Sequence, residues 1–122
     1  MFVNLEHNEK HSIESYTDQS ICIHGQSYQD SCIISHDTIK THWPIHSIKE
    51  LNDTLLAAVL TFKPKIILIG HEEMNMFAPR IVTEALIKQN IALEVMPIGS
   101  ACRTFNILLS EKRPAVLGII FK

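Results

Sequence analysis

From residue 47 onward the sequence alternates helical patterns with short aliphatic runs, and this alternation constrains the fold more than any other feature. The aliphatic runs are residues 66–69, 91–96 and 115–121, and apolar side chains recur at helical spacing in residues 47–62, 79–90 and 99–109. Strands separated by helices indicate a largely parallel sheet with helices on its faces. We therefore predict the order α-β-α-β-α-β for this part of the chain.

The segment before residue 47 is more polar and holds six of the seven histidines. Residues 20–23 and 28–34 predict two strands joined through Gly25, and residues 40–43 a third short strand that Pro44 ends. We expect this hairpin to extend or cover the main sheet. A chain of 122 residues suits one domain, so residues 1–122 are predicted to form a single unit.

Local signals place the helix ends. Ser47 and Glu50 have the spacing of a capping box, which predicts a helix from Ser47 to about Phe62. Pro79 suits the first position of the next helix, where a missing N–H costs nothing. The expected buried stripe of that helix is Ile81, Val82, Ala85 and Leu86.

Composition excludes several classes of protein. There are 11 basic and 13 acidic residues, a formal charge of −2, which argues against a nucleic-acid partner. No apolar run approaches the roughly 20 residues of a membrane span, so an integral membrane protein is not expected. The first ten residues lack the pattern of a signal peptide, and three cysteines without a C-x-x-C pair indicate reduced thiols. We expect a cytoplasmic protein.

The turn before the third helix is the best candidate for binding an anion or other ligand. Gly99 and Ser100 open this helix, where free amides and the helix dipole attract negative charge. Arg103 and Thr104 lie in its first turn and could add a charge and a hydroxyl group. The simpler alternative is a capped helix with an exposed arginine. Neither nucleotide-binding glycine motif is present.

His71 follows the strand of residues 66–69, at the carboxyl end where open α/β sheets bind ligands. It is therefore a further ligand-binding candidate that could face residues 99–104. Because Glu72 and Glu73 come next, the alternative interpretation is a solvated acidic loop.

Two more residues near this turn invite a functional hypothesis. Glu94 interrupts an apolar strand, and if that strand is central the carboxylate needs a partner, for which Arg103 is the candidate. We favour a structural ion pair over catalysis. Cys102 has the position of an activated thiol, but it shares a stripe with Phe105 and Leu109, so we expect a buried structural thiol.

The polar N-terminal segment raises the question of a metal site. Cys22, His24, Cys32 and His36 could meet on a hairpin, but their spacings are not those of a common zinc motif. We expect no metal site, no cofactor and no catalytic residue.

The segment from Glu94 to Met96, residues 101–108, and then Glu111 and Arg113 resemble the signature of a small domain family of unknown function. That family includes a mitochondrial respiratory complex I assembly factor and an adipogenesis-associated cytoplasmic protein. The resemblance implies an α/β fold of three layers, in which helices flank a mixed central sheet and the N-terminal hairpin forms an added β layer. It also implies that the final strand runs antiparallel to the others.

This chain departs from the family pattern in two places. His71 and Glu72 stand where threonine and glycine usually follow Gly70, and Pro97 and Ile98 stand where aspartate and threonine usually follow the next strand. Both changes fall at the predicted crevice.

The resemblance implies no established enzymatic activity and points to protein partners. The leading hypothesis is a non-enzymatic binding or assembly module, with homo-oligomerisation left open. The alternative is a small anion- or ligand-binding protein, or an enzyme, that uses residues 99–104.

Overall fold

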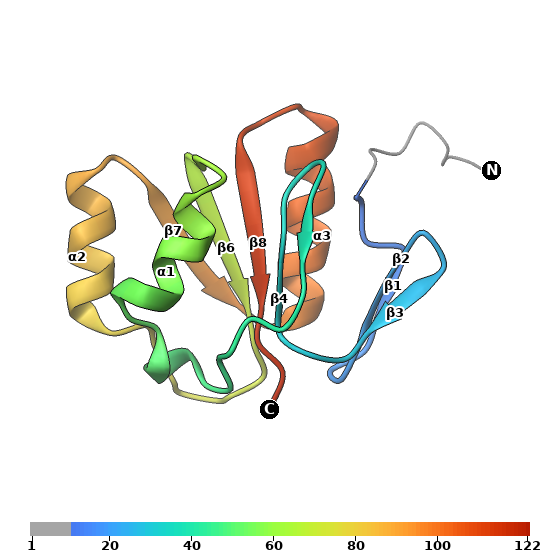
Figure 1. Cartoon of the computed structure of the whole chain (residues 1–122), viewed down its shortest axis with the longest axis horizontal. Helices are drawn as coiled ribbons and strands as arrows, with labels where there is room; N and C mark the ends of the chain where they lie inside the picture. The colour runs from blue at the N-terminus through green and yellow to red at the C-terminus, as the bar shows by residue number, and fades with distance from the viewer. Residues whose placement is uncertain (1–10) are drawn as a thin grey trace.

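The computed structural model describes residues 11–122, and a five-stranded mixed sheet forms its centre (Figure 1). The strands are β4 (Cys32–Ile34), β5 (Ile39–Lys40), β6 (Ile66–Gly70), β7 (Ala92–Met96) and β8 (Ala115–Ile119). Their spatial order is β5-β4-β8-β6-β7. β6 is parallel to both β7 and β8, whereas β4 is antiparallel to β8 and to β5.

A second, antiparallel sheet of three short strands precedes it: β1 (Ser15–Tyr16), β2 (Ile21–Ile23) and β3 (Gln26–Tyr28). The turn between β2 and β3 is His24-Gly25, and both residues have positive φ, 53° and 75°. Two positive φ values match the twist of a tight hairpin, which explains why glycine stands at this position.

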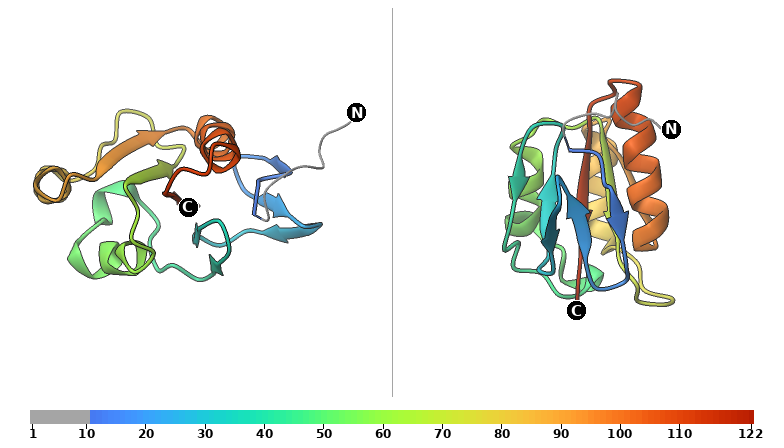
Figure 2. Two further views of the ribbon diagram at one scale, coloured as in Figure 1. Left: turned by 90° about the horizontal axis from the view of Figure 1, so that it is seen from above. Right: turned by 90° about the vertical axis from the view of Figure 1, so that its right-hand side faces the viewer.

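The elements form three layers (Figures 1 and 2). One face of the main sheet carries a 3₁₀ turn, η1 (Ile48–Glu50), and the helices α1 (Asp53–Leu60) and α2 (Arg80–Lys88). The other face carries α3 (Ile98–Ser110) and, beside it, the small sheet. The α/β fold with a mixed central sheet, flanking helices and an added β layer is thus confirmed. None of the helices in residues 11–122 has the length and apolar character needed to cross a bilayer.

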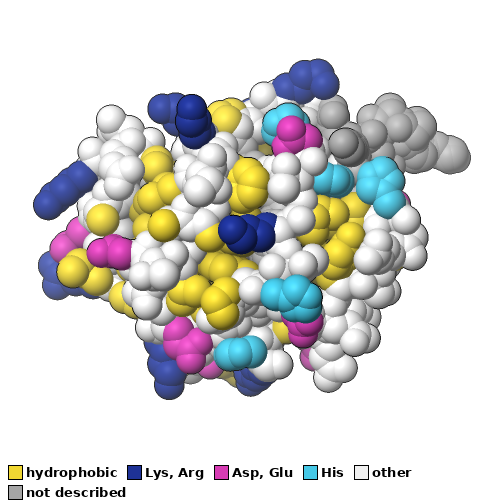
Figure 3. All heavy atoms as spheres, in the orientation of Figure 1, with side chains coloured by type: hydrophobic (Ala, Val, Ile, Leu, Met, Phe, Trp, Pro, Cys, Tyr) yellow, Lys and Arg dark blue, Asp and Glu magenta, His cyan; other side chains and the backbone are white. Residues whose placement is uncertain are grey.

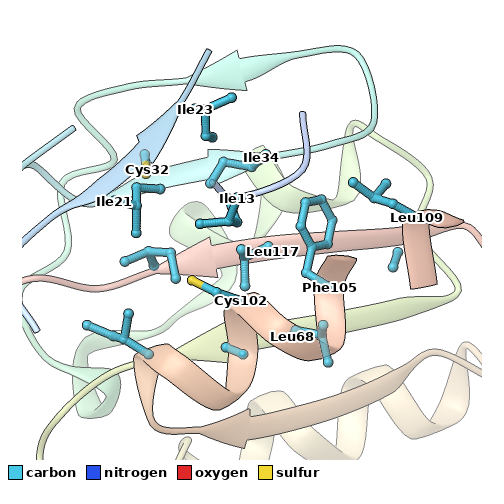
Figure 4. Close-up of a cluster of buried hydrophobic side chains, with 14 of the residues drawn as sticks. Ile13, Ile21, Ile23, Cys32, Ile34, Leu68, Cys102, Phe105, Leu109 and Leu117 are labelled. Atoms are coloured by element: carbon cyan, nitrogen blue, oxygen red, sulfur yellow. The ribbon is translucent and has the colours of Figure 1, made fainter. Parts of the chain in front are cut away.

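The core between α3 and the two sheets is almost entirely aliphatic (Figure 4). Cys102 and Phe105 of α3 pack with Leu117 of β8, and Ile21 of β2 closes the cluster from the small sheet. All five residues of β8 are buried because it lies between β4 and β6 and is covered on both faces. The small sheet is therefore part of the same hydrophobic core.

Two predicted strands of the N-terminal segment differ from the structure. Residues 28–34 do not form one strand, because β3 ends at Tyr28 and β4 begins at Cys32 in the other sheet. Ser31 holds the segment that passes from the small sheet to the main sheet. Its hydroxyl donates to the Ile45 carbonyl at 2.8 Å and accepts from the Phe121 N–H at 2.8 Å. The strand expected at residues 40–43 is β5, and His42, with φ 57°, lies beyond its end.

The helix predicted from Ser47 to Phe62 is broken into η1 and α1. Glu50 accepts from the N–H of His46 at 2.8 Å, one residue earlier than a capping box requires. Leu51 then leaves the helical region at ψ 126°. Asn52 starts α1 anew by accepting from the Leu55 N–H at 2.9 Å.

Two further expectations are wrong. β8 runs parallel to β6 rather than antiparallel, because α3 returns the chain to the end of the sheet where β6 and β7 begin. In α2, Val82 and Leu86 are buried as expected, but the side chain of Ile81 is 76% exposed. Pro79 is the N-cap of α2 rather than its first residue.

Gly70, at the end of β6, gives the first testable prediction. A Cβ atom there would lie 3.0 Å from Cβ of Ala101 and 3.1 Å from Cα of Ile98, both in α3. We expect Gly70→Val to lower the free energy of unfolding by about 1–3 kcal/mol, because α3 must move away from the sheet. Urea denaturation measures this. The control is Ala92→Val at an exposed strand position, expected within about 0.5 kcal/mol of the parent. Equal effects of the two substitutions would show that α3 does not depend on Gly70.

Candidate functional site

The carboxyl ends of β6 and β7 meet the start of α3, and the predicted ligand-binding residues lie around this point. Gly99, Ser100 and Arg103 line one hollow of about 290 Å³, together with Tyr16, Asp18 and Glu72. Thr104 is directed elsewhere, since its hydroxyl donates to the sulfur of Met96 at 3.8 Å. His71 does not line this hollow but lines two neighbouring ones.

The N-terminus of α3 is already occupied by a carboxylate of the chain itself. Pro97, the N-cap residue, makes no side-chain cap. Instead the N–H of Ile98 donates to Oε2 of Glu72 at 2.7 Å. A carboxylate at this place satisfies a free amide and complements the positive end of the helix dipole. The negative charge of Glu72 therefore disfavours a second anion at this end of the helix.

Glu73 makes the equivalent contact on the opposite face of the sheet. Its Oε1 accepts from the N–H of Ile48, the first residue of η1, at 3.2 Å. A hydrogen bond from Ser47 is the main reason that the pKa of Glu73 is lowered, and the Ile48 N–H and the charges of His71 and Lys122 act in the same direction. The carboxylate form thus stabilises the start of η1.

His71 contacts the backbone of the same turn. Its ring is buried and Nδ1 accepts from the N–H of Glu73 at 3.1 Å, so the neutral ring carries its proton on Nε2. Burial lowers the pKa of His71, while the charges of Glu73 and Glu72 oppose this effect. The acidic loop is therefore a structured turn in which all three side chains contact the backbone.

Arg103 does not pair with Glu94, contrary to the sequence prediction. Its guanidinium donates to the hydroxyl of Tyr16 and to Ser100 Oγ at 3.4 Å, and it lies 5.8 Å from the centre of the Tyr16 ring. Gly99 allows this approach, since a Cβ there would be 2.7 Å from the ring. Arg103 lies on the side of α3 that faces β1, whereas Thr104 lies on the side that faces β7. Glu94 belongs to β7, so Arg103 and Glu94 are on opposite sides of α3. Glu94 is exposed, because β7 is an edge strand rather than a central one.

Cys102 is buried, as the sequence predicted. Burial raises the pKa of both Cys102 and Cys32 to about 12, and the charge of Arg103 only partly offsets this for Cys102. Neither thiol is suited to act as a nucleophile near neutral pH. Within residues 11–122, no group of three or more His, Cys, Asp or Glu side chains is arranged to hold a metal ion.

Sequence reasoning missed most of a cleft of about 670 Å³. It is lined by Asp18, Gln19, Gln29, His46, the turn of residues 71–73, and residues 120–122. Apart from the turn of residues 71–73, these residues come from separate segments that only the fold brings together, and no local pattern marks them. The three residues of the turn are the ones already engaged with backbone amides.

Sequence reasoning also missed the exposed apolar side chains that follow this turn. Met74 and Phe77 are 85% and 78% exposed, and we call the segment from Met74 to Phe77 the apolar loop. Both line a hollow of about 350 Å³ that also includes Val95, Met96 and Pro97. In the right-hand view of Figure 2 the segment between β6 and α2 projects at the lower end of the molecule, on the side of α3. Hydrophobic side chains also reach the surface over α1 and α2, interspersed with charged groups (Figure 3).

Sequence comparisons find relatives that match most of the chain. A family model described as "Protein of unknown function (DUF498/DUF598)" matches residues 13–120. NADH dehydrogenase [ubiquinone] 1 alpha subcomplex assembly factor 3 of Xenopus tropicalis is 28% identical over 111 residues, covering 88% of this chain and 60% of that protein. A protein of Francisella tularensis named "13 kDa major membrane protein" is 30% identical over 69 residues, covering 57% of this chain and 56% of that protein. The chain thus spans only about 60% of the length of these relatives.

Solved structures show the same fold. The NMR structure of Xanthomonas campestris XCC1710 has a TM-score of 0.83 at 30% identity and covers 96% of this chain and 89% of its own. The solution NMR structure of a Bordetella pertussis protein described as a Mth938-like domain has a TM-score of 0.77 at 16% identity, covering 92% and 86% of the two chains. The second likeness supports the fold alone.

The cap of α3 by Glu72 gives the second testable prediction. Glu72→Ala should lower the free energy of unfolding by about 0.5–2 kcal/mol, because the Ile98 N–H loses its acceptor. Thermal and urea denaturation measure this. Glu94→Ala is the matched control, since it removes an exposed carboxylate from the adjacent strand and should stay within about 0.5 kcal/mol. If both substitutions are equally mild, the carboxylate of Glu72 does not hold α3.

The thiols give the third prediction. Under native conditions a thiol reagent should modify Cys22 quickly, because it is only partly buried, and leave Cys32 and Cys102 unmodified. Cys22→Ser should therefore abolish the fast phase of labelling, followed by absorbance and located by mass spectrometry. Rapid modification of Cys102 would contradict its structural role.

Proposed function

The chain belongs to the family described as "Protein of unknown function (DUF498/DUF598)", and we propose that it is a non-enzymatic binding module that takes part in protein assembly. This membership confirms the resemblance recognised in residues 94–113. Support for assembly comes from relatives such as those of Xenopus tropicalis and Danio rerio, both named assembly factor 3 of the NADH dehydrogenase alpha subcomplex.

One observation carries the proposal. The polar side chains at the carboxyl end of the sheet are hydrogen-bonded to backbone amides of the chain itself, whereas the large apolar side chains just beyond them are exposed. Glu72 and Glu73 accept from backbone amides, and His71 accepts from Glu73. An enzyme of this architecture needs such groups free to contact a substrate. Exposed aromatic and methionine side chains are, in contrast, characteristic of protein interfaces.

The charge and the thiols support the same choice of partner and compartment. A net charge of −2 disfavours nucleic acid, which leaves protein as the macromolecular partner we propose. The three cysteines are free, as suits a reducing compartment such as the cytoplasm. Anion binding by Gly99, Ser100, Arg103 and Thr104 has less support, because the carboxylate of Glu72 already lies at the start of α3 and would repel a second anion.

The apolar loop gives the fourth prediction. Phe77→Asp should remove most partners captured from a lysate of the source cells, because it places a charge at the centre of the proposed interface. Ile107→Asp is the matched control, since Ile107 is 57% exposed on α3, away from this loop. Quantitative mass spectrometry compares the captured proteins, and thermal melts confirm that both variants fold.

The proposal fails if Phe77→Asp and the parent capture the same proteins in the same amounts. It also fails if Ile107→Asp removes them equally, because the loss would then follow from added charge rather than from the loop.

A further inference from the structure

The outer edge of β7 is an unpaired strand edge. Among residues 11–122, β7 has β6 as its one hydrogen-bonded neighbour, at the end of the five-stranded sheet. The N–H of Ala92 donates to Lys65 at 3.0 Å, and the carbonyl of Met96 accepts from His71 at 3.1 Å, so these residues direct their backbone groups toward β6. Because backbone direction alternates along a strand, Leu93 and Val95 direct N–H and C=O groups outward. β7 therefore offers a short template for another strand.

The side chains along β7 define what that strand should carry. Glu94 is exposed on the α3 side of the sheet, and among residues 11–122 no ion pair or hydrogen bond engages its carboxylate. Two residues further along the same side, Met96 lies at the hollow that the apolar loop encloses. A negative charge and an apolar hollow thus lie two positions apart on one face.

A second copy of this chain fits the edge poorly. In the antiparallel register with the greatest overlap, two β7 strands would pair about their central residue and place the two Glu94 side chains opposite each other. Like charges directly opposite across strands are destabilising. A strand with a positive charge at that position avoids this repulsion and forms a favourable cross-strand pair instead.

We propose that β7 binds an extended segment of a protein partner in which a lysine or arginine lies two residues from a large apolar side chain. Backbone pairing with Leu93 and Val95 holds the segment, the basic residue pairs with Glu94, and the apolar residue enters the hollow beside Phe77. This inference rests on the proposed function, because it names the kind of segment that the binding module recognises.

The direct test uses a capped synthetic peptide of sequence TLTKTLT, whose symmetry presents the same pattern in either strand direction. Amide hydrogen exchange is followed by NMR on the intact chain. Without peptide, the amide of Glu94 should be protected and those of Leu93 and Val95 should exchange rapidly. The peptide should protect Leu93 and Val95 in a saturable manner. Unchanged exchange of these two amides at saturating peptide would overturn the proposal. The proposal would also fail if, without peptide, the two amides became more protected as the protein concentration rises, because that result would indicate pairing with a second copy of the chain.

Charge reversal tests the recognition of the basic residue. The parent should bind TLTKTLT more tightly than TLTETLT, and Glu94→Lys should reverse this preference, with a change of roughly fivefold in the ratio of the two affinities. Arg80→Glu, on the outer surface of α2, is the control and should leave the ratio unchanged. An unaltered ratio in Glu94→Lys would contradict the proposal.

The outcome separates this inference from the proposed function. If Phe77→Asp removes captured partners while Glu94→Lys retains them and no peptide protects β7, protein binding stands and only the edge proposal fails. If Phe77→Asp removes no partner, the proposed function fails whatever the peptides do.

Discussion

The turn after β6 is the constraint on which the rest of this structure depends. Glu72 accepts from the first amide of α3 on one face of the sheet, and Glu73 accepts from the first amide of η1 on the other face. Gly70 allows α3 to approach closely enough for the first contact, and His71 accepts a hydrogen bond from the backbone N–H of Glu73 within the turn. Glu72 and Glu73 therefore tie one helical element on each face of the sheet to the turn between them.

This use of the turn has a functional consequence. The carboxyl end of an open α/β sheet is where such folds usually bind small ligands, because strand ends and helix N-termini leave polar groups free there. Here the carboxylate of Glu72 accepts from the first amide of α3, and the backbone amide of Glu73 donates to the ring of His71. The surfaces beside the turn include the apolar loop and the edge of β7, and both suit a protein partner better than a small substrate.

The sequence was sufficient where burial is strong and continuous. The stripe of α3 and the aliphatic runs of β6 and β8 were predictable because each is covered on a whole face or on both faces. It was insufficient where a partner distant in sequence decides the structure. The exposure of Glu94 depends on the strand order, and the cap by Glu72 depends on the meeting of segments 26 residues apart. The break at Leu51 is a different case, because local contacts that replace the expected capping box decide it. Ile81 fits the helical pattern as well as Val82 does. Only the way α2 lies on the sheet makes Val82 buried and Ile81 exposed.

The central claim is that Glu72 occupies the anion site at the start of α3, and NMR titration with inorganic sulfate tests it most directly. In the parent chain the amide resonances of Ile98, Gly99 and Ser100 should not respond to sulfate beyond the general effect of ionic strength. In Glu72→Ala the same resonances should shift in a saturable manner, because the freed helix N-terminus can then accept an external anion. Saturable shifts of these amides in the parent would contradict the claim, since they would show that the site is open while Glu72 is present.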